Sequence, residues 1–396
     1  MSLGNGRTYL AIPGPSVMPE RVIRAMMRAA PNIYHGELPD MMPDLIRDLK
    51  SVARTRHNAA IYICNGHGAW EAAAANVLSP GDKVLVASTG RFSHGWAEVA
   101  RSLGIEPEIL EFGLRSPIDP ERVKERLAAD TEGRIRAVTV VQTDTSTSVR
   151  SDVPAIRRAI DAAGHDALLM VDSIACLGCD VMEMDAWGVD VLVTASQKGL
   201  MTPPGLGFVF YNDKADRWRE AVKSVSYYWD WRPRTEPDYF YRYFAGTAPT
   251  HLLYALREAL DMIAEEGLEQ IWWRHGILAQ AVWAAFEHWG EEGPLELNAP
   301  DRSFRSHAVT GVRVGSDKAT ELRNWCENQA GLTLGIGLGM EPTDHFFRLG
   351  HMGHVNAQMV LGALATIEAG LKTVGIPHAR GGAEAAGEVI ARNTSP

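Results

Sequence analysis

The middle of the chain alternates short apolar runs with segments whose apolar residues recur at helical spacing. Residues 136–142 and 167–171 are almost continuously apolar, which is typical of strands buried on both faces of a parallel sheet. Strands that alternate with helices predict right-handed parallel crossovers, so we expect an α/β domain. The expected strands are residues 59–64, 83–87, 136–142, 167–171, 189–194 and 205–211, and the expected helices are residues 67–78, 93–103 and 153–163.

The C-terminal third follows a different pattern. Residues 250–289 repeat apolar positions every three or four residues and predict long helices, and later segments predict a strand at 308–314 and a helix at 318–329. A chain of 396 residues exceeds the size at which a single core keeps growing. We therefore expect three parts, namely an N-terminal arm (1–20), a large domain (21–278) and a small C-terminal α+β domain (279–396).

Composition and charge exclude several classes of function. Apolar residues make up 46% of the chain and the net charge is −10, which disfavours nucleic acid or an anionic membrane as the main partner. The apolar stretches stay well below the ~18 residues that a membrane span needs. Four cysteines do not make a disulfide scaffold in a chain of this length. We expect a cytoplasmic protein with no nucleic-acid or membrane partner.

Three polar segments follow predicted strands, at the sheet edge where ligands bind in such folds. They are residues 65–68 (Asn-Gly-His-Gly), Asp172 and Lys198. Singly, each has a plainer interpretation as a glycine turn, a helix-capping residue or a solvated surface charge. Together they fit one chemistry, because a helix N-terminus suits a phosphate, a carboxylate keeps a pyridine nitrogen protonated and a lysine can form a Schiff base.

Five segments, in a fixed order along nearly the whole chain, carry a resemblance to a known family. They are Ile12-Pro13-Gly14-Pro15-Ser16, Gly66-His67-Gly68-Ala69-Trp70-Glu71-Ala72, Val171-Asp172-Ser173-Ile174, Ser196-Gln197-Lys198-Gly199 with Pro203-Pro204-Gly205, and Phe347-Arg348-Leu349-Gly350-His351-Met352-Gly353. Each segment alone is a weak signal. The ordered set resembles the class V aminotransferases of fold type I, which use pyridoxal 5'-phosphate, and within them the serine–glyoxylate and alanine–glyoxylate group.

The resemblance implies a fold and a role for each matching residue. The fold is the PLP-dependent transferase fold type I, with a mostly parallel sheet in the large domain and a smaller C-terminal α+β domain. Lys198 would be the Schiff-base lysine and proton shuttle, Asp172 would contact the pyridinium nitrogen, and Arg348 would bind the substrate carboxylate. The other implied contacts are Asn65, Gly66, His67 and Gln197 around the phosphate, Phe92 and Ile174 on the two ring faces, Thr145 near the phenolic oxygen, and Gly14 beside the substrate.

The resemblance also implies an assembly, and the sequence departs from the family at three places. Thr247 matches a hydroxyl that reaches the phosphate from the neighbouring subunit, which implies a homodimer with shared sites. Asn65 replaces the usual Ser or Thr, and Phe244 replaces a tyrosine that bonds the phosphate. Ser148 stands where the family has a glycine.

The implied reaction moves an amino group from a small amino acid (serine, alanine or aspartate) to a small 2-oxo acid, with glyoxylate as the expected acceptor. Residues 142–147 are closer to the ureidoglycine–glyoxylate branch. The alternative is therefore a transaminase of ureidoglycine or pyridoxamine with glyoxylate or pyruvate. A non-catalytic PLP-binding regulator is more remote, because no basic helix-turn-helix extension is visible.

Three further patterns have competing interpretations. Cys176-Leu177-Gly178-Cys179 is better explained by buried small residues than by zinc or redox work, and we expect no metal. The glycine-rich residues 335–339 lie too late in the chain for a nucleotide loop and are expected to turn the chain near Arg348. The aromatic and basic segment 227–243, with Arg232, Arg234 and Arg242, is either a surface and interface segment or a pocket cover that brings a second arginine to an acidic donor.

Overall fold

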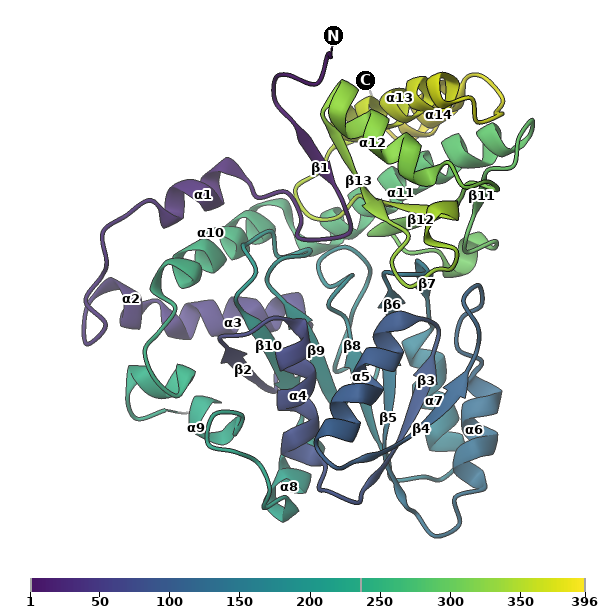
Figure 1. Ribbon diagram of the computed structural model, residues 1–396. Coiled ribbons are helices and arrows are strands. Elements are labelled where there is room, and N and C mark those ends of the chain that lie inside the picture. Colours follow the sequence, from purple (N-terminus) through teal and green to yellow (C-terminus); the bar gives the residue numbers. More distant parts are fainter. Residues whose placement is uncertain (1, 236, 395–396) are drawn as a thin grey trace.

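The computed structural model describes residues 2–235 and 237–394 and contains two main sheets, one below the other in Figure 1. The larger sheet has the strand order β2-β10-β9-β8-β5-β3-β4, and a two-stranded sheet pairs β6 with β7. Their bounds are β2 (Asn58–Tyr62), β3 (Lys83–Ser88), β4 (Glu106–Glu111), β5 (Ile135–Val141), β6 (Thr143–Asp144), β7 (Val149–Arg150), β8 (Leu168–Asp172), β9 (Val191–Ala195) and β10 (Gly207–Tyr211).

The prediction of a mostly parallel sheet is confirmed. Strands β4, β3, β5, β8 and β9 run parallel, whereas β10 is antiparallel to both of its neighbours, β9 and β2. The connection from β9 to β10 (residues 196–206) contains no helix, so the chain returns in the opposite direction and does not cross over. The sequence pattern missed β4, whose edge position leaves it partly exposed and interrupts its apolar run with Glu106, Pro107 and Glu108.

Helices cover both faces of the larger sheet. Alternate residues of its strands enter two separate cores, as when Leu85 packs on one face while Val84 and Val86 pack on the other. Figure 1 shows α4 and α5 in front of the sheet. The helices of this part are α1 (Glu20–Met26), α2 (Glu37–Asp40), α3 (Met42–Val52), α4 (Gly66–Val77), α5 (Arg91–Ser102), α6 (Pro120–Ala128), α7 (Val153–Ala162), α8 (Asp213–Ala221), α9 (Arg232–Thr235), the 3-10 turn η1 (Phe240–Phe244) and α10 (Thr250–Glu266).

The smaller sheet has the order β1-β13-β14-β12-β11. The N-terminal arm joins it, because β1 pairs in parallel with β13 through Tyr9–Leu332 to Ala11–Leu334. The elements of this part are β1 (Tyr9–Ala11), α11 (Leu268–Gly290), β11 (Glu296–Leu297), η2 (Arg302–Phe304), β12 (Val309–Arg313), α12 (Ala319–Ala330), β13 (Leu332–Ile336), η3 (Thr343–His345), β14 (Phe346–Gly350), α13 (Ala357–Val374) and α14 (Gly382–Asn393).

Helix α11 links the two parts. Its first apolar residues, Leu268 and Ile271, pack in a core of the large sheet, whereas its residues from Leu278 onward pack in the core of the small sheet. The proposed division at residues 20 and 278 stays a prediction. Within the described residues no helix is long and apolar enough to cross a membrane.

Candidate active site

Lys198 lies in the connection between β9 and β10, at the end of the sheet that the sequence predicted. Hydrogen bonds fold this connection tightly: Ser196 Oγ donates to the Pro203 carbonyl (2.6 Å), and Ser16 Oγ donates to the Lys198 carbonyl (2.7 Å). Burial, and next to it the charge of Arg348, lowers the pKa of the Lys198 amine to about 8. A substantial fraction of this amine is therefore neutral near pH 8, as a nucleophilic lysine requires.

The N-terminal arm lies directly against this lysine. Lys198 Nζ donates a hydrogen bond to the Pro13 carbonyl, and the Ser16 amide donates to the Gln197 carbonyl (2.8 Å). Gly14 has φ +108°, and a Cβ there would collide with the Lys198 side chain. A glycine is therefore required at position 14 both by the backbone conformation and by the close approach of the lysine.

Asp172 ends strand β8 and is 3% exposed. Its two carboxylate oxygens accept hydrogen bonds from the Ile174 amide (2.6 Å) and from Trp70 Nε1 (3.0 Å). Burial raises the pKa of this carboxyl to about 7, although both hydrogen bonds and the charge of Lys198 oppose the shift. A buried carboxylate held by two N–H donors suits a protonated ring nitrogen as a partner.

A pocket of about 240 Å³ brings most of the predicted site residues together. The lysine and the aspartate lie on its wall, together with both residues predicted to cover the two ring faces. The predicted residues that line it are Asn65, Gly66, His67, Phe92, Thr145, Asp172, Ile174, Gln197 and Lys198. Gly14, Thr247 and Arg348 are not among its lining residues.

The phosphate end of the pocket differs from the expectation in one respect. A helix N-terminus suits a phosphate through its free N–H groups, but at the start of α4 the Asn65 side chain accepts hydrogen bonds from the His67 and Gly68 amides (3.1 and 3.3 Å). Asn65 therefore caps the helix itself. A phosphate would take these two donors only if the Asn65 side chain rotates away.

The two residues expected on the ring faces are positioned by the backbone around them. Ile174 packs against Gly66, where a Cβ would lie 2.5 Å from Ile174 Cδ1. On the other side, the Phe92 amide donates to Asp144 Oδ2 (2.8 Å), which ties the start of α5 to strand β6. The rings of Phe92 and Trp70 lie edge to face, with centroids 6.3 Å apart.

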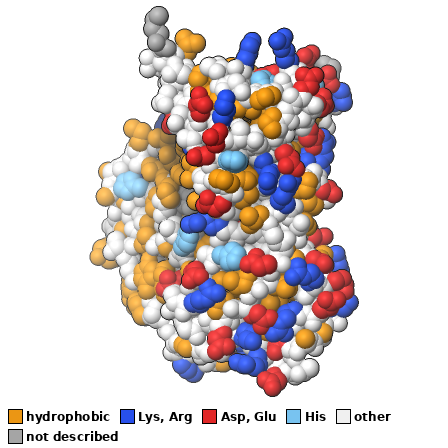
Figure 2. Space-filling model, turned by 45° about the vertical axis from the view of Figure 1, so that its right-hand side comes forward, with side chains coloured by type: hydrophobic (Ala, Val, Ile, Leu, Met, Phe, Trp, Pro, Cys, Tyr) orange, Lys and Arg blue, Asp and Glu red, His pale blue; other side chains and the backbone are white. Residues whose placement is uncertain are grey.

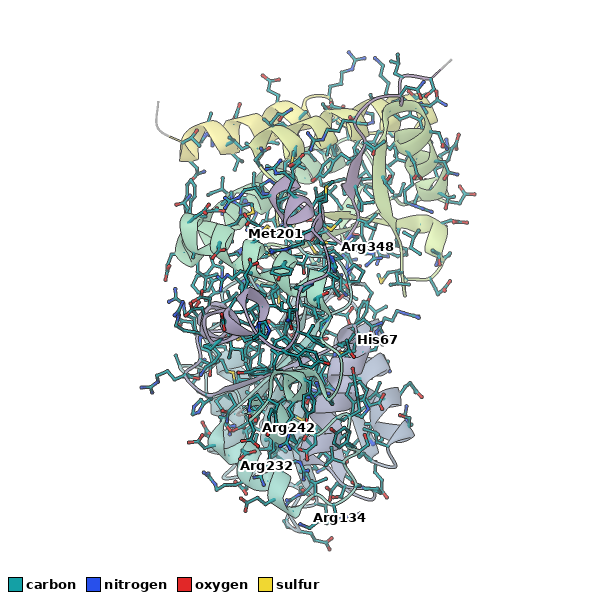
Figure 3. All side chains as sticks on the ribbon, turned by 90° about the vertical axis from the view of Figure 1, so that its left-hand side faces the viewer. His67, Arg134, Met201, Arg232, Arg242 and Arg348 are labelled. Carbon is teal, nitrogen blue, oxygen red and sulfur yellow. The ribbon has the colours of Figure 1, made fainter. Side chains whose placement is uncertain are left out.

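Arg348 comes from the small sheet, on β14, and is 7% exposed. Its Nε donates to the Ile336 carbonyl (2.7 Å) and its Nη1 donates to the Thr145 carbonyl (2.9 Å). Burial lowers the pKa of this guanidinium to about 10, so it stays charged at neutral pH. The outer edge of the fork, formed by Nη1 and Nη2, is the part that remains for a carboxylate. Figure 3 shows Arg348 and His67 on the same side of the molecule.

Thr247 and Phe244 lie in different environments. Thr247 is exposed, whereas Phe244 is fully buried in the core of its own chain. Phe244, which replaces the tyrosine of the family, is therefore a packing residue in its own subunit. Thr247 keeps the exposure that a contact with another subunit needs.

None of the arginines of segment 227–243 lines the pocket of its own chain. Glu236 of this segment lies outside the described residues. Arg234 is 1% exposed and donates to the carbonyls of Ile61 and Tyr243 (both 3.0 Å). Arg232 pairs with Asp216 on α8 (3.1 Å). Figure 3 shows Arg232 and Arg242 well below His67 and Arg348. The interpretation of Arg232 or Arg234 as a donor-binding arginine is wrong for this site, because both guanidinium groups are already engaged.

The other two patterns are structural. Cys176 and Cys179 are fully buried, and Cys176 Sγ donates to Gln142 Oε1 (3.2 Å). Among the described residues no group of three or more histidine, cysteine or acidic side chains is arranged to hold a metal ion. Residues 335–339 end β13 and turn the chain, and the Ile336 carbonyl in this turn is the one that holds Arg348. The expectation of a turn near Arg348 is confirmed.

Sequence reasoning missed two residues that shape the site. Trp70 lies one helical turn after His67, so helical spacing alone would have placed it on the pocket side of α4. Asp144 is fully buried and accepts hydrogen bonds from Ser146 and from the Phe92 amide, 52 residues away in the chain. No local pattern could have revealed that second partner.

The residues present fit pyridoxal phosphate. Lys198 and Asp172 share one pocket, and Gly66 leaves the space beside Ile174 that a ring needs. Gln197 lines the pocket, and its Oε1 is buried without a hydrogen-bond partner among the described residues. The same amide turned by 180° would present its NH2 group, a donor, to a phosphate. An unpaired buried polar atom in a pocket is explained by a polar ligand.

Comparisons with known proteins agree with this chemistry. A family model described as aminotransferase class-V matches residues 8–338. The chain is 37% identical to a serine–glyoxylate aminotransferase of Methylorubrum extorquens, covering 96% of this chain and 95% of the relative. It is 35% identical to an L-aspartate–glyoxylate aminotransferase of Paracoccus denitrificans, covering 97% of this chain and 96% of the relative.

Two solved structures share the fold over their whole length. A ureidoglycine–glyoxylate aminotransferase from Bacillus subtilis has a TM-score of 0.88 at 27% identity, covering 99% of this chain and all of that chain. A pyridoxamine–pyruvate aminotransferase from Mesorhizobium loti has a TM-score of 0.90 at 25% identity, covering all of both chains. The predictions of fold type I and of an enzyme are confirmed. The chain belongs to the class V aminotransferases, and its cofactor is pyridoxal phosphate.

Proposed function

We propose that the protein transfers the amino group of a small amino acid to glyoxylate, with Lys198 as the residue that holds the cofactor covalently. The observation that carries this proposal is that Lys198 and Asp172 line the same pocket. The activities for which the relatives are named suggest the substrates: serine or aspartate with glyoxylate in the two relatives above, and alanine with glyoxylate in a relative from Oryctolagus cuniculus. The alternatives are ureidoglycine or pyridoxamine as the amine, as in the two solved structures.

Each residue then has one task. When bound, pyridoxal phosphate supplies an electron sink for the electron pair released at the donor's Cα. Lys198 Nζ would take up the proton from that carbon, and its pKa of about 8 suits a base near neutral pH. Asp172 keeps the proton on the ring nitrogen.

The remaining residues bind and orient. Arg348 binds the substrate carboxylate. Gly14, which has no side chain, lets the N-terminal arm lie close to the substrate. The proposed cofactor contacts are Asn65, Gly66, His67 and Gln197 at the phosphate, Phe92 and Ile174 on the ring faces, and Thr145 at the phenolic oxygen.

We further propose a homodimer in which Thr247 reaches the partner's site. Exposed large hydrophobic side chains support an interface, since Met27, Tyr34, Tyr227 and Tyr239 are each more than 60% exposed. In the face of the molecule that Figure 2 shows, hydrophobic side chains gather along the left, while charges of both signs mix over the right. Sedimentation alongside activity measurements tests this, and an active monomer would contradict it. The cytoplasmic location and the lack of a nucleic-acid partner stay predictions.

The experiment that tests the function combines labelling with a donor screen. Borohydride reduction followed by peptide mapping should place the cofactor on Lys198. Lys198→Ala should lose this label and all turnover, whereas Lys124→Ala, at a half-buried lysine of α6, should keep both. Each candidate amine is then added alone to follow the loss of the cofactor's visible absorbance. A label on another lysine, or no response to any amine, would refute the proposal.

A further inference from the structure

Arg91 directly precedes Phe92, a residue of the pocket wall, and is a cation that the functions assigned so far do not use. It begins α5, and its side chain is exposed. Within the described part of the chain its guanidinium makes no hydrogen bond and no ion pair, whereas Arg101 on the same helix pairs with Glu98. A guanidinium without an acidic partner beside a substrate pocket is available to an anion.

The stem of Arg91 lies against the turn that also anchors Arg348. A Cβ at Gly339 would lie 2.9 Å from Arg91 Cβ and 3.1 Å from Arg91 Cδ, so the stem packs on this glycine. Three residues earlier in the same turn, the Ile336 carbonyl accepts the hydrogen bond from Arg348 Nε (2.7 Å). One turn of the small sheet therefore positions two arginines, one from each part of the molecule.

The charge of Arg91 acts on the pocket. After burial, it is the cause that lowers the pKa of His67, a residue of the pocket wall. The guanidinium of Arg91 is therefore near enough to His67 to oppose a positive charge on that side chain.

No acidic side chain of the pocket neutralises Arg91. Asp144 is fully buried, and its carboxylate accepts hydrogen bonds from the Phe92 amide and from Ser146. Asp172, the one acid among the pocket's described lining residues, is held by Trp70 and Ile174. Arg91 itself is fixed at its backbone, where its amide donates to Ser146 Oγ (3.2 Å). A charge held at its base and unpaired at its end is arranged to meet an incoming anion.

We propose that Arg91 binds the distal carboxylate of a dicarboxylic amino donor, the class that includes aspartate, while Arg348 binds the carboxylate next to the reacting amine. This inference rests on the proposed function. It replaces Arg232 and Arg234 in that role, because their guanidinium groups are engaged elsewhere in the fold. Serine and alanine have no second carboxylate, so Arg91 distinguishes donors and does not bind all of them alike.

The kinetic test compares donors in matched variants. Arg91→Gln should lower the ratio of kcat/KM for aspartate to kcat/KM for serine by roughly 10- to 100-fold, the effect of losing a charge-assisted contact. Arg91→Lys, which keeps the charge but loses the planar fork, should lower the ratio less. Arg134→Gln is the control, because it removes the same charge from an exposed site at the far end of the large domain (Figure 3). An unchanged ratio in Arg91→Gln would overturn the proposal.

A binding test separates this inference from the proposed function. Calorimetry on the cofactor-loaded enzyme compares succinate, which has two carboxylates and no amine, with propionate, which has one. Succinate should bind more tightly than propionate, and Arg91→Gln should remove that advantage while Arg134→Gln preserves it. Equal binding of the two acids to the unmodified enzyme would overturn the proposal. Failure of every amine in the donor screen would overturn the proposed function and leave this binding result standing.

Discussion

The two walls of the active site are built in different ways. The cofactor wall comes from the ends of three strands of one sheet. Residues 65–67 and 197–198 follow β2 and β9, and residues 172–174 begin at the last residue of β8. The donor wall joins remote segments, with Pro13 from the arm, Arg91 from α5 and Arg348 from β14. The topology of a parallel sheet dictates the first wall, whereas contacts between separate parts of the chain create the second. The chemistry is therefore built into the sheet, and the choice of substrate depends on how the parts pack together.

The largest effect should come from the cofactor wall, in Asp172→Asn. The amide cannot hold a proton on the ring nitrogen, which should cost about 3 kcal/mol of barrier, or roughly a 100-fold loss in kcat. Asp172 accepts hydrogen bonds from two N–H donors, Trp70 Nε1 and the Ile174 amide. In the variant the side-chain NH2 group faces one of these donors and cannot accept its hydrogen bond. Single-turnover kinetics measure the loss. Trp70→Phe is the control, because it removes one of those donors and keeps the charge, so its loss should be smaller.

The same variant should change how stability depends on pH in the cofactor-free protein. The pKa of Asp172 is raised to about 7, so between about pH 4 and pH 7 the folded state binds more protons than the unfolded state. This group therefore lowers the stability as the pH rises through that window. In urea titrations, the stability of Asp172→Asn relative to the unmodified protein should therefore rise between about pH 4 and pH 7. Parallel curves would contradict the buried, proton-retaining carboxyl.

On the donor wall, Arg348→Ala should weaken every substrate. Loss of the charge-assisted contact should raise KM for serine, aspartate and glyoxylate alike, by roughly 10- to 100-fold. This uniform loss differs from the donor-specific loss expected at Arg91. Steady-state kinetics with all three substrates therefore distinguish the roles of the two arginines. A loss confined to one substrate would show that Arg348 does not bind the carboxylate that all of them share.

The two walls also differ in how far the sequence predicts them. Lys198 and Asp172 follow apolar strands, and a strand end determines on which edge of the sheet a side chain lies. Arg234 shows the limit, because an aromatic and basic segment does not reveal which way a side chain points. It lies over the Tyr62 ring, 4.4 Å from its centroid, and is buried. The role of Arg91 depends on Gly339, 248 residues later in the chain, and no local pattern connects them.

The smallest expected effect is on stability and concerns Ser148, where the large domain contacts the small sheet. This residue has φ +59°, a conformation that favours the glycine usual in the family, so its backbone is strained. Its Oγ donates to the Thr147 carbonyl (2.6 Å) and accepts from the buried Gly311 amide on β12 of the small sheet (3.0 Å). Ser148→Gly relieves about 1 kcal/mol of strain but leaves that buried amide unpaired, which costs about 1–3 kcal/mol.

The unpaired amide should outweigh the relief, because Gly311 is enclosed by its neighbours and water cannot replace the lost hydroxyl. We expect Ser148→Gly to be about 1 kcal/mol less stable than the unmodified protein, and Ser148→Ala, which keeps the strain and loses the same bond, to be about 1 kcal/mol less stable again. Urea unfolding of the three proteins gives this order. A glycine variant more stable than the unmodified protein would show that backbone strain outweighs the contact, and that the donor wall is held in place by contacts other than this hydrogen bond.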